Sequence, residues 1–452
     1  MTAPLTVSAK GTRGWEAFAA DVAAAQGAIA GPARVGNLAA GRYDFLVGLA
    51  AALLNGQTTV LPSSRAPEAV RVALEPLEDA LILGERHGVD APALANLPRG
   101  TEAPAGDLIA RLAAAPGEIR VFTSGSTGLP VSHRKTWKSL AGGATLTDVV
   151  LREAGLTEPF AIIGTTPQQH MYGLEAAIFT GLAHGRCLYD GAVFYPDDLA
   201  RAAAECRAAG IESLVLATSP LHLRYLAPAI RETPEIRLIL SATAPMPDDL
   251  ARAVEATAPV YEIYGSTETG SLGWRRTVEG PWWQVGLDFE LTTRADGHYA
   301  AASHNAETVR LADRLNIAAD GRFQLLGRLG DMVHVAGKRT SLGALNALVS
   351  GAPGLLDGVF HRRRGEGRGA GDDTLTLIAV PDPSTGMTPT ALRTALQKHL
   401  RAHVDAVFLP HRIRFVTDLD RGPTGKIAAS DLARLAEVEE EAASNPATAP
   451  SP

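Results

Sequence analysis

Hydroxyl side chains and glycines lie together in the segment Thr123–Pro130, TSGSTGLP, directly after the β-branched run IRVFT. Hydroxyl donors and glycine backbone that a ligand can approach closely are what a chain of phosphate groups requires. An ordinary surface loop has a similar composition, so both interpretations stay open for this segment alone. It is not a Walker A loop, because the pattern G-x-x-x-x-G-K-[ST] is absent from it.

A second polar turn ends the segment Tyr261–Gly270, YEIYGSTETG, which begins with strand-forming residues. The carboxylate of Glu268 in this turn could hold a hard cation such as Mg²⁺ beside phosphates, or it could be a solvated loop side chain. Ligands of parallel sheets bind at the carboxyl ends of the strands. Two such turns in one parallel sheet therefore favour a functional site.

The elements that would position these turns follow a regular order from about residue 119. Short β-branched runs alternate with segments of helical period, which predicts right-handed crossovers and a mostly parallel sheet. The predicted strands are 119–123, 161–166, 211–218, 236–240 and 260–265, and the predicted helices are 171–185, 197–210, 219–230 and 245–257. In the last helix Pro247 suits the first turn.

After about residue 290 the pattern changes to short strands and turns, and Asp-Gly pairs at 296–297 and 320–321 predict two hairpins. Further predicted elements are a helix near 341–350, a strand 373–380, a helix 388–400, a strand 412–416 and a helix from about 429. The sequence thus predicts an α/β fold. Its large N-terminal domain, 1–327, has parallel sheets, helices and a small β region, and a small α+β C-terminal domain, 328–442, follows. Residues 443–452 have no apolar period and are expected to be disordered.

Composition narrows the class of protein. The 452 residues have a formal net charge of −7, so the chain has no global basic field for nucleic acid or an anionic membrane. Cys187 and Cys206 are the two cysteines, too few for a disulfide framework, which favours a reducing compartment and two inert buried thiols. The apolar segment Phe45–Leu54 is shorter than the roughly 20 residues of a membrane span. We therefore expect a cytoplasmic protein without a membrane span.

Taken together, five segments resemble motifs of the adenylate-forming (AMP-binding) superfamily, of the acyl-CoA synthetase and aryl-acid ligase type. They occur in the family's order between about residues 119 and 430. TSGSTGLP is similar to its phosphate loop, PQQHMYGLE (167–175) to its substrate-side motif, and YGSTETG to its adenine and magnesium motif. Residues 309–345 resemble its ribose-binding aspartate, hinge and second-step loop, and RGPTGKIA (421–428) its C-terminal lysine motif.

The resemblance implies a reaction in two steps. ATP activates a small carboxylic acid to an acyl-AMP with Mg²⁺, and the acyl group then passes to the thiol of coenzyme A or of a carrier-protein phosphopantetheine. A mobile C-terminal domain would serve both steps by rotation about its hinge. An acyl carrier protein is therefore a possible partner. A non-catalytic or regulatory ATP-binding member of the same fold is the alternative.

The resemblance also assigns roles to single residues. It implies that the phosphates of ATP are bound by Thr123, Ser124, Gly125, Ser126, Thr127 and Gly128. Adenine and ribose would be bound by Tyr264, Gly265, Thr267, Asp313 and Arg328, and Mg²⁺ by Glu268. His170 and Lys426 would act on the reacting acid, and Gly337 and Lys338 would contact the thiol. Cationic groups where negative charge accumulates suit the attack of a carboxylate on a phosphate. Retention of Glu268, Asp313, Arg328 and Lys426 argues against a binding-only protein.

Several positions depart from the family's pattern. Val131 stands where the phosphate loop usually has a lysine, and His133, Arg134 or Lys135 could supply the missing charge. Gly330 replaces the usual hinge acid, and Asp331 follows it. The region before the phosphate loop is short, which suggests a trimmed N-terminal subdomain.

Three further features bear on the substrates. The resemblance implies an acid pocket lined by residues near His170, by the turn 241–245 and by the segment after YGSTETG. Trp274, Trp282 and Trp283 could stack on an aromatic, hydroxybenzoate-like acid or could pack the small β region. The basic cluster His361–Arg368 is predicted to lie between two strands, either as a solvated hairpin tip or as a docking site for coenzyme A or a carrier protein. The sequence leaves the acid, the acceptor and the oligomeric state open.

Overall fold

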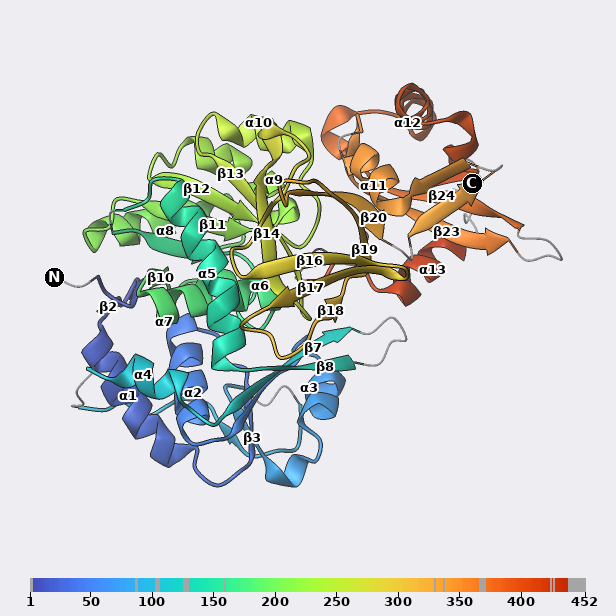
Figure 1. Ribbon diagram of the computed structural model, residues 1–452. Coiled ribbons are helices and arrows are strands. Elements are labelled where there is room, and N and C mark those ends of the chain that lie inside the picture. Colours follow the sequence, from blue (N-terminus) through green and yellow to red (C-terminus); the bar gives the residue numbers. More distant parts are fainter. Residues whose placement is uncertain are drawn as a thin grey trace, which may run out of the picture. The chain divides into compact units, whose positions relative to one another are not determined.

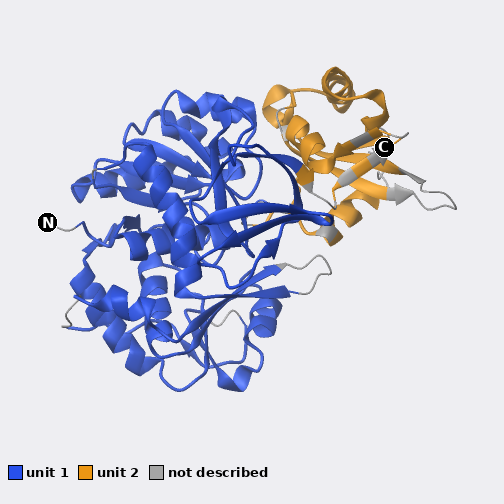
Figure 2. Cartoon of the chain, viewed as in Figure 1, with its two compact units in different colours: residues 1–326, 423–425 blue, residues 327–422, 426–452 orange. Residues whose placement is uncertain are grey.

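The computed structural model describes residues 3–85, 88–101, 106–124, 130–157, 159–328, 331–335, 338–350, 352–365, 371–422, 425 and 427–437. The chain divides into two compact units (Figure 2), Met1–Leu326 with Pro423–Gly425 and Gly327–Gly422 with Lys426–Pro452. The tail 443–452, which the sequence predicts to be disordered, lies outside the described residues. The assignment of separate functions to domains 1–327 and 328–442 stays a prediction.

A nine-stranded sheet runs through the first unit (Figure 1). Its strands, in spatial order, are β15 (Gln284–Val285), β14 (Gly270–Arg276), β13 (Val260–Ser266), β12 (Ile236–Ser241), β11 (Leu214–Thr218), β9 (Ala161–Gly164), β10 (Cys187–Tyr189), β1 (Thr6–Ser8) and β2 (Gly11–Arg13). The strands from β13 to β1 pair in parallel, and β2, β14 and β15 are antiparallel to their neighbours.

Three helices connect the parallel strands of this sheet: α8 (Pro196–Ala208), α9 (Pro220–Arg231) and α10 (Asp248–Glu255). The predicted alternation of strands and helices is therefore confirmed. Pro247 is the N-cap of α10 and not a residue of its first turn, so that detail of the prediction was wrong by one position.

A second sheet of six strands lies in the same unit. It has the order β6 (Ala93–Leu94), β5 (Ala80–Leu83), β3 (Arg34–Asn37), β4 (Thr58–Leu61), β7 (Glu118–Ser124) and β8 (Pro130–Lys135). Only β8 is antiparallel, as the second strand of a hairpin with β7. The helices of this region are α1 (Trp15–Ala28), α2 (Arg42–Leu54), α3 (Pro67–Leu74), the short 3₁₀ turn η1 (Leu77–Asp79) and α4 (Leu108–Ala113). The two polar turns thus follow strands of different sheets, which corrects the expectation of one common sheet.

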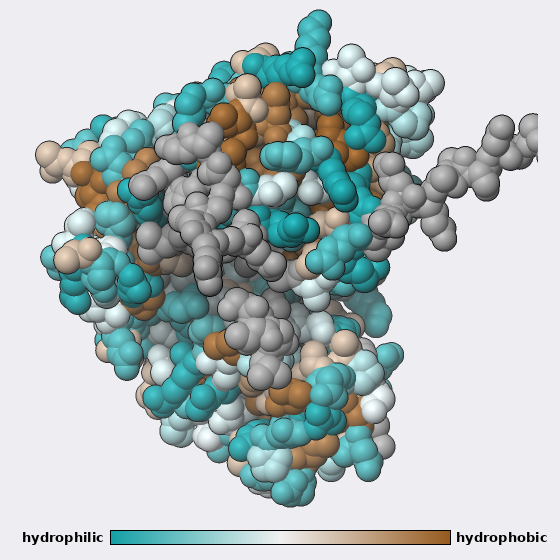
Figure 3. Space-filling view, turned by 90° about the vertical axis from the view of Figure 1, so that its right-hand side faces the viewer, coloured by the Kyte–Doolittle hydropathy of each residue, from teal (hydrophilic) through white to brown (hydrophobic). Residues whose placement is uncertain are grey.

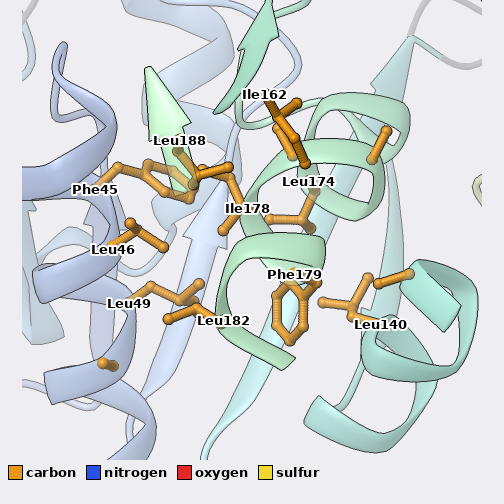
Figure 4. Packing of buried hydrophobic residues seen from close by; sticks show 14 of the residues in the cluster. Phe45, Leu46, Leu49, Leu140, Ile162, Leu174, Ile178, Phe179, Leu182 and Leu188 are labelled. Carbon is orange, nitrogen blue, oxygen red and sulfur yellow. The ribbon is translucent and has the colours of Figure 1, made fainter. Parts of the chain in front are cut away.

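The core between the two sheets is built by helices (Figure 4). Helix α5 (Trp137–Glu153) packs against α6 (Met171–Gly173), the π-helical turn η2 (Leu174–Phe179) and α7 (Thr180–His184). In Figure 4, Leu49 of α2 faces Leu182, and Phe179 faces Leu140 of α5. The helix predicted for 171–185 is therefore interrupted by a π turn. Thr180 Oγ1 donates a hydrogen bond to the Glu175 carbonyl oxygen, five residues earlier, at 2.7 Å.

The region after β15 is a small β region, as predicted. It contains the hairpin β16 (Phe289–Arg294) and β17 (Gly297–Ala302), then β18 (Val309–Arg310) and the hairpin β19 (Asp313–Ile317) and β20 (Phe323–Arg328). The 3₁₀ turn η3 (Thr277–Glu279) precedes it. Asp320 and Gly321 lie in the loop between β19 and β20, and Asp296 lies in the turn before Gly297, the first residue of β17, which confirms the prediction of two hairpins.

The second unit is a small α+β unit with its own core. Its elements are β21 (Met332–Val335), β22 (Lys338–Ser341), α11 (Leu342–Ser350), β23 (Leu355–Gly365), β24 (Gly371–Pro381), η4 (Pro383–Thr385), α12 (Pro389–His403), η5 (Ala406–Phe408), β25 (Arg412–Phe415) and α13 (Ala429–Glu437). Arg362 pairs with Leu375 and Arg363 with Thr374 in the β23–β24 ladder. Arg362, Arg363 and Arg364, which the sequence placed in a hairpin tip, are therefore part of the strand β23, whereas Arg368 lies outside the described residues.

No helix in the described part of the chain is long and apolar enough to cross a membrane. The apolar segment Phe45–Leu54 belongs to α2 and is buried in the core, apart from the partly exposed Leu54. The face in Figure 3 is largely hydrophilic, and its hydrophobic residues form separate patches. Cys187 and Cys206 are both buried and not disulfide-bonded, as expected from the sequence.

Candidate nucleotide and acid site

The predicted phosphate loop connects the two strands of the β7–β8 hairpin. Gly125, Ser126, Thr127 and Gly128 lie outside the described residues, and so does the side chain of Ser124. Thr123, near the end of β7, has its Oγ1 3.1 Å from Nε2 of His133 on β8. The hairpin therefore joins the start of the loop to the strand that follows it.

His133, Arg134 and Lys135, which could replace the missing lysine of the phosphate loop, all lie on strand β8. Lys135 is only 5% exposed, and its Nζ donates a hydrogen bond to the main-chain oxygen of Glu268 at 3.0 Å. Because side chains alternate along a strand, Arg134 points to the other face, where it pairs with Glu118. The structure thus brings Lys135, and not Arg134, to the Glu268 turn.

His133 adds a second contact between the two turns. Its Nε2 lies 4.0 Å from a carboxylate oxygen of Glu268. Burial lowers the pKa of His133, and the charge of Lys135 lowers it further, although Glu268 acts in the opposite direction. The hairpin of one sheet and the turn of the other therefore meet through His133 and Lys135.

The turn between β13 and β14 presents Glu268 to solvent. Its side chain is 52% exposed, whereas Thr267 is partly buried and Thr269 is buried. Burial of the Glu268 carboxyl raises its pKa, but hydrogen bonds from its own backbone and Ser266 and the charges of His133 and Lys135 outweigh it, so the pKa is lowered. An ionised, half-exposed oxygen ligand fits Mg²⁺, which takes one or two carboxylates together with substrate phosphates.

Backbone geometry explains the glycines of this turn. The ladder of β13 and β14 is irregular between Tyr264 and Gly265. A Cβ on Gly265 would lie 2.2 Å from the carbonyl oxygen of Gly270. Only glycine fits there, because the two strands approach each other too closely for a side chain.

Two of the residues predicted for adenine and ribose, Tyr264 on β13 and Asp313 on β19, are brought together from different sheets. The Tyr264 hydroxyl donates a hydrogen bond to a carboxylate oxygen of Asp313 at 2.8 Å. The Tyr264 ring lies against Trp283 and Phe323, with centroid distances of 5.7 and 5.6 Å. The side chain of Arg328 lies outside the described part of the structure.

The substrate-side motif forms the start of the interrupted helix. His170 is the N-cap of α6, and its main-chain oxygen accepts a hydrogen bond from Leu174 N at 2.7 Å. A Cβ on Gly173 would lie 2.4 Å from the Pro167 carbonyl oxygen, which explains the glycine. His170 is partly buried and lies at the end of the motif that continues into η2.

Glu175, the last residue of this motif, is a buried carboxyl that the sequence analysis did not single out. It is 1% exposed, and one oxygen accepts hydrogen bonds from Ser271 N at 2.8 Å and Ser271 Oγ at 2.7 Å. Burial raises the pKa of Glu175 to about 7, although the bonds from Ser271 and the charge of Lys135 oppose the shift. A π-helical turn often marks a functional site, and that was the signal available here.

A cavity of about 370 Å³ opens beside this carboxyl. Its lining consists of Gly142, Thr145, Leu146, Val149, Glu153, Ser271, Trp274, Gln284, Val285, Gly286, Leu287, Asp288, Phe289 and His304. The segment expected to form the acid pocket, the residues after YGSTETG, supplies much of this wall. His170 and the turn 241–245, which were expected there too, are not part of it.

The three tryptophans have different surroundings. Trp274 lines the cavity, and its ring lies 5.6 Å from that of Tyr261. Trp283 is 4% exposed and stacks on Phe323 in the core of the small β region. Arg322 lies over the ring of Trp282 at 5.5 Å. Of the three, only Trp274 is available to a ligand in the cavity.

The residues predicted to act from the second unit are only partly described. Lys426 and Gly337 lie outside the described residues. Lys338 is exposed, and its Nζ forms an ion pair with Asp405 at 2.5 Å within the same unit. Roles of these three residues in the reaction stay predictions.

Comparisons with known proteins show what the chain and its fold are similar to. The family model for AMP-binding enzymes matches residues 119–293. A 4-coumarate–CoA ligase of Rhodobacter capsulatus is 29% identical over 67% of this chain and 73% of its own length, and one from Halorhodospira halophila is 28% identical over 71% and 78%. ATP-bound MatB from Rhodopseudomonas palustris shares the fold, with a TM-score of 0.74, 18% identity and coverage of 96% of both chains.

The matched family model, the relatives and the shared fold together support the AMP-binding superfamily of adenylate-forming enzymes. Within that superfamily it is an AMP-forming acid–thiol ligase, which uses ATP to activate a carboxylic acid. The relatives named above are ligases, which favours an enzyme over the binding-only or regulatory alternative.

Proposed function

We propose that this enzyme is an acid–coenzyme A ligase whose substrate is an aromatic, hydroxybenzoate-like acid. The observation that carries the proposal is that the Lys135–Glu268 contact lies at one end of β14, whose Ser271 and Trp274 line the 370 Å³ cavity. Relatives act on acids of this kind: 3-hydroxybenzoate or 4-hydroxybenzoate is the substrate in the name of a Thauera aromatica ligase, which is 25% identical over 73% of this chain. A cavity of 300 to 1,000 Å³ suits a ring-sized ligand.

In the first step a carboxylate oxygen of the acid attacks the α-phosphorus of ATP, the bond to the β-phosphate breaks, and pyrophosphate leaves. Thr123, with the hydroxyls and glycines that follow it, binds the phosphates, and Asp313 accepts hydrogen bonds from the ribose. Tyr264, Gly265 and Thr267 line the adenine. Lys135, Lys426 and Arg328 supply positive charge where two anions meet, which is the largest requirement of such a reaction.

Glu268 is the proposed magnesium ligand. The lowered pKa of its carboxyl keeps it ionised at neutral pH. Bound Mg²⁺ would neutralise phosphate charge. The chain's own part is to hold the Glu268 turn in place, through the hydrogen bond from Lys135 to its main-chain oxygen.

The direct test of the function is a panel of carboxylic acids scored by acid-dependent exchange between ATP and pyrophosphate. Aryl acids with and without ring hydroxyls, cinnamic acids, malonate and short fatty acids make up the panel. We expect the highest kcat/KM with a hydroxylated aryl acid. Preference for an aliphatic or dicarboxylic acid would contradict the proposed substrate class and leave the ligase activity intact.

Substitution Glu268→Gln is expected to lower the exchange rate about 100-fold at limiting Mg²⁺, because one charged group of a preorganised site is lost. The thermal midpoint should change little, since the side chain is 52% exposed. Exchange rates across a magnesium titration give the measurement. Glu307→Gln, an exposed glutamate of the same unit, is the matched control. An unchanged magnesium dependence would remove Glu268 from the metal site.

In the second step of the proposal the thiol attacks the acyl carbonyl and AMP leaves. Coenzyme A is the proposed acceptor, because the relatives compared above are named as coenzyme A ligases. A phosphopantetheine arm on a carrier protein presents the same thiol and is the competing acceptor. The Gly337 and Lys338 loop is the part of the second unit assigned to the thiol.

Charge reversal on β23 tests whether the basic strand steers the acceptor. Arg362→Glu with Arg363→Glu is expected to slow thioester formation several-fold at low salt and to leave pyrophosphate exchange unchanged. The defect should shrink as salt screens the charges. Arg401→Glu on α12, an exposed arginine of the same unit, is the control. If wild type and variant formed the thioester at equal rates with coenzyme A and with a carrier protein, these arginines would have no role in steering the acceptor.

A further inference from the structure

His304 is a buried imidazole whose hydrogen-bonding groups are unused. The residue is 7% exposed and lines the cavity described above. Neither ring nitrogen has a hydrogen-bond partner, and the nearest acidic oxygen, on Asp288, lies 3.9 Å from Nδ1. Buried polar groups in proteins are nearly always satisfied by a protein group, water or a ligand. A donor and an acceptor at a cavity wall therefore point to a polar group inside the cavity.

The imidazole is held in place by its neighbours. The Phe289 ring meets it edge to face, with a centroid distance of 5.2 Å. A Cβ on Gly142 would lie 2.3 Å from Cγ of His304, so this glycine of α5 makes room for the ring. Glycine inside a helix costs roughly 1 kcal/mol relative to alanine. An alanine at this position would displace the ring, so Gly142 helps to set where the His304 ring lies.

Ser271 contributes a second polar group to the same cavity wall. Its hydroxyl hydrogen is used in the bond to Glu175, so its oxygen presents lone pairs only. The adjacent α5 glycine, Gly143, leaves room for Glu175, because a Cβ there would lie 2.0 Å from the carboxylate. The glycine pair of α5 thus accommodates both polar side chains, His304 and Glu175.

Charge around the cavity selects against an anion. Burial lowers the pKa of His304, the charges of Lys135 and Lys138 lower it further, and Asp288 opposes them, so the ring is neutral at neutral pH. A neutral imidazole has one donor and one acceptor. The carboxylates of Glu153 and Asp288 line the same cavity and disfavour a second carboxylate on the ligand.

We propose that His304 and Ser271 form a polar subsite that binds an uncharged hydroxyl group carried on the side chain of the acid. A hydroxyl group both donates and accepts hydrogen bonds. It would donate to Ser271 Oγ or to the unprotonated ring nitrogen of His304, and it would accept from the imidazole N–H. Trp274 and Phe289 contribute the apolar walls for the ring that carries it. The inference rests on the proposed function, in that the acid's side chain must enter this cavity.

The experiment compares matched acids with matched variants. Benzoate, 3-hydroxybenzoate, 4-hydroxybenzoate and isophthalate are measured by pyrophosphate exchange with wild type, His304→Phe and His304→Gln. We expect wild type to prefer one hydroxybenzoate over benzoate by about 100-fold or more, since a site built to bind a hydroxyl rejects the analogue without it. His304→Phe should lower the ratio of hydroxybenzoate to benzoate activity at least 10-fold. The loss should come from slower exchange with the hydroxybenzoate, while the rate with benzoate stays unchanged. His304→Gln, which keeps a donor and an acceptor, should retain part of the preference.

Two further variants separate this effect from general damage. Gly142→Ala should shift the ring and reduce the same ratio, whereas Gly27→Ala in α1, where a Cβ would meet nothing within 4 Å, should leave it unchanged. Thermal midpoints of all variants identify any that fail to fold. An equal loss for benzoate and hydroxybenzoates would overturn the subsite while the ligase function stands. A wild type that exchanges pyrophosphate with no aryl acid would overturn the proposed substrate class and the subsite with it.

Discussion

Substitution Lys135→Met is expected to lower acid-dependent pyrophosphate exchange by about 100- to 1,000-fold, the loss seen when one preorganised donor is removed from a reacting site. The lysine is buried, donates to the main chain of the Glu268 turn, and is the cation that β8 brings to that turn. Burial lowers the pKa of Lys135, but the nearby carboxylates of Glu175 and Glu268 favour its charged form.

Controls for this variant separate position from charge. Lys138→Met removes an exposed lysine three residues away and should keep the wild-type rate. The double variant Lys135→Met with Glu175→Gln leaves no unpaired buried charge, so it should recover thermal stability. If the exchange rate recovered as well, Lys135 would act only by neutralising Glu175. A rate that stays low while stability returns supports a role at the Glu268 turn.

Lys426→Ala is expected to lower the rate of acyl-adenylate formation about 1,000-fold, because the resemblance places this lysine between the carboxylate and the α-phosphate. Thioester formation from a pre-made acyl-adenylate should stay near the wild-type rate, since the lysine serves only the first step. Both half-reactions are measured separately, with Lys398→Ala on α12 as the control. An equal loss in both half-reactions would contradict the division of labour between two faces of the second unit.

Local patterns predicted elements only from residue 119 onward, and strand β10 was missed there. The alternation gave the parallel strands β9, β11, β12 and β13 and their helices, and Asp-Gly pairs gave both hairpins, because these signals depend on neighbours in sequence. The same alternation rule applied to β8 would have separated Lys135 from Arg134. The basic run His361–Arg364 was not recognised as part of strand β23, because charged residues are uncommon in strands. The pairing of β23 with β24 depends on residues that are distant in the sequence.

The parts of the site that the sequence did not predict are set by contacts between distant residues. Glu175 is buried because Ser271, almost a hundred positions later, satisfies one of its oxygens, and because α5 has a glycine beside it. His304 reaches the cavity from the small β region, where no motif marks it. The two polar turns belong to different sheets, so only the tertiary structure reveals that Lys135 and His133 join them.

The state of the two native thiols makes this chain suitable for site-specific labelling. Burial raises the pKa of Cys187 and of Cys206 to about 12, so neither forms the thiolate that reacts with maleimides. A single cysteine introduced at the exposed Arg401 of the second unit would then carry a fluorophore without removal of the native residues. With a second label at exposed Tyr195 of the first unit, energy transfer could follow the second unit through each half-reaction in real time.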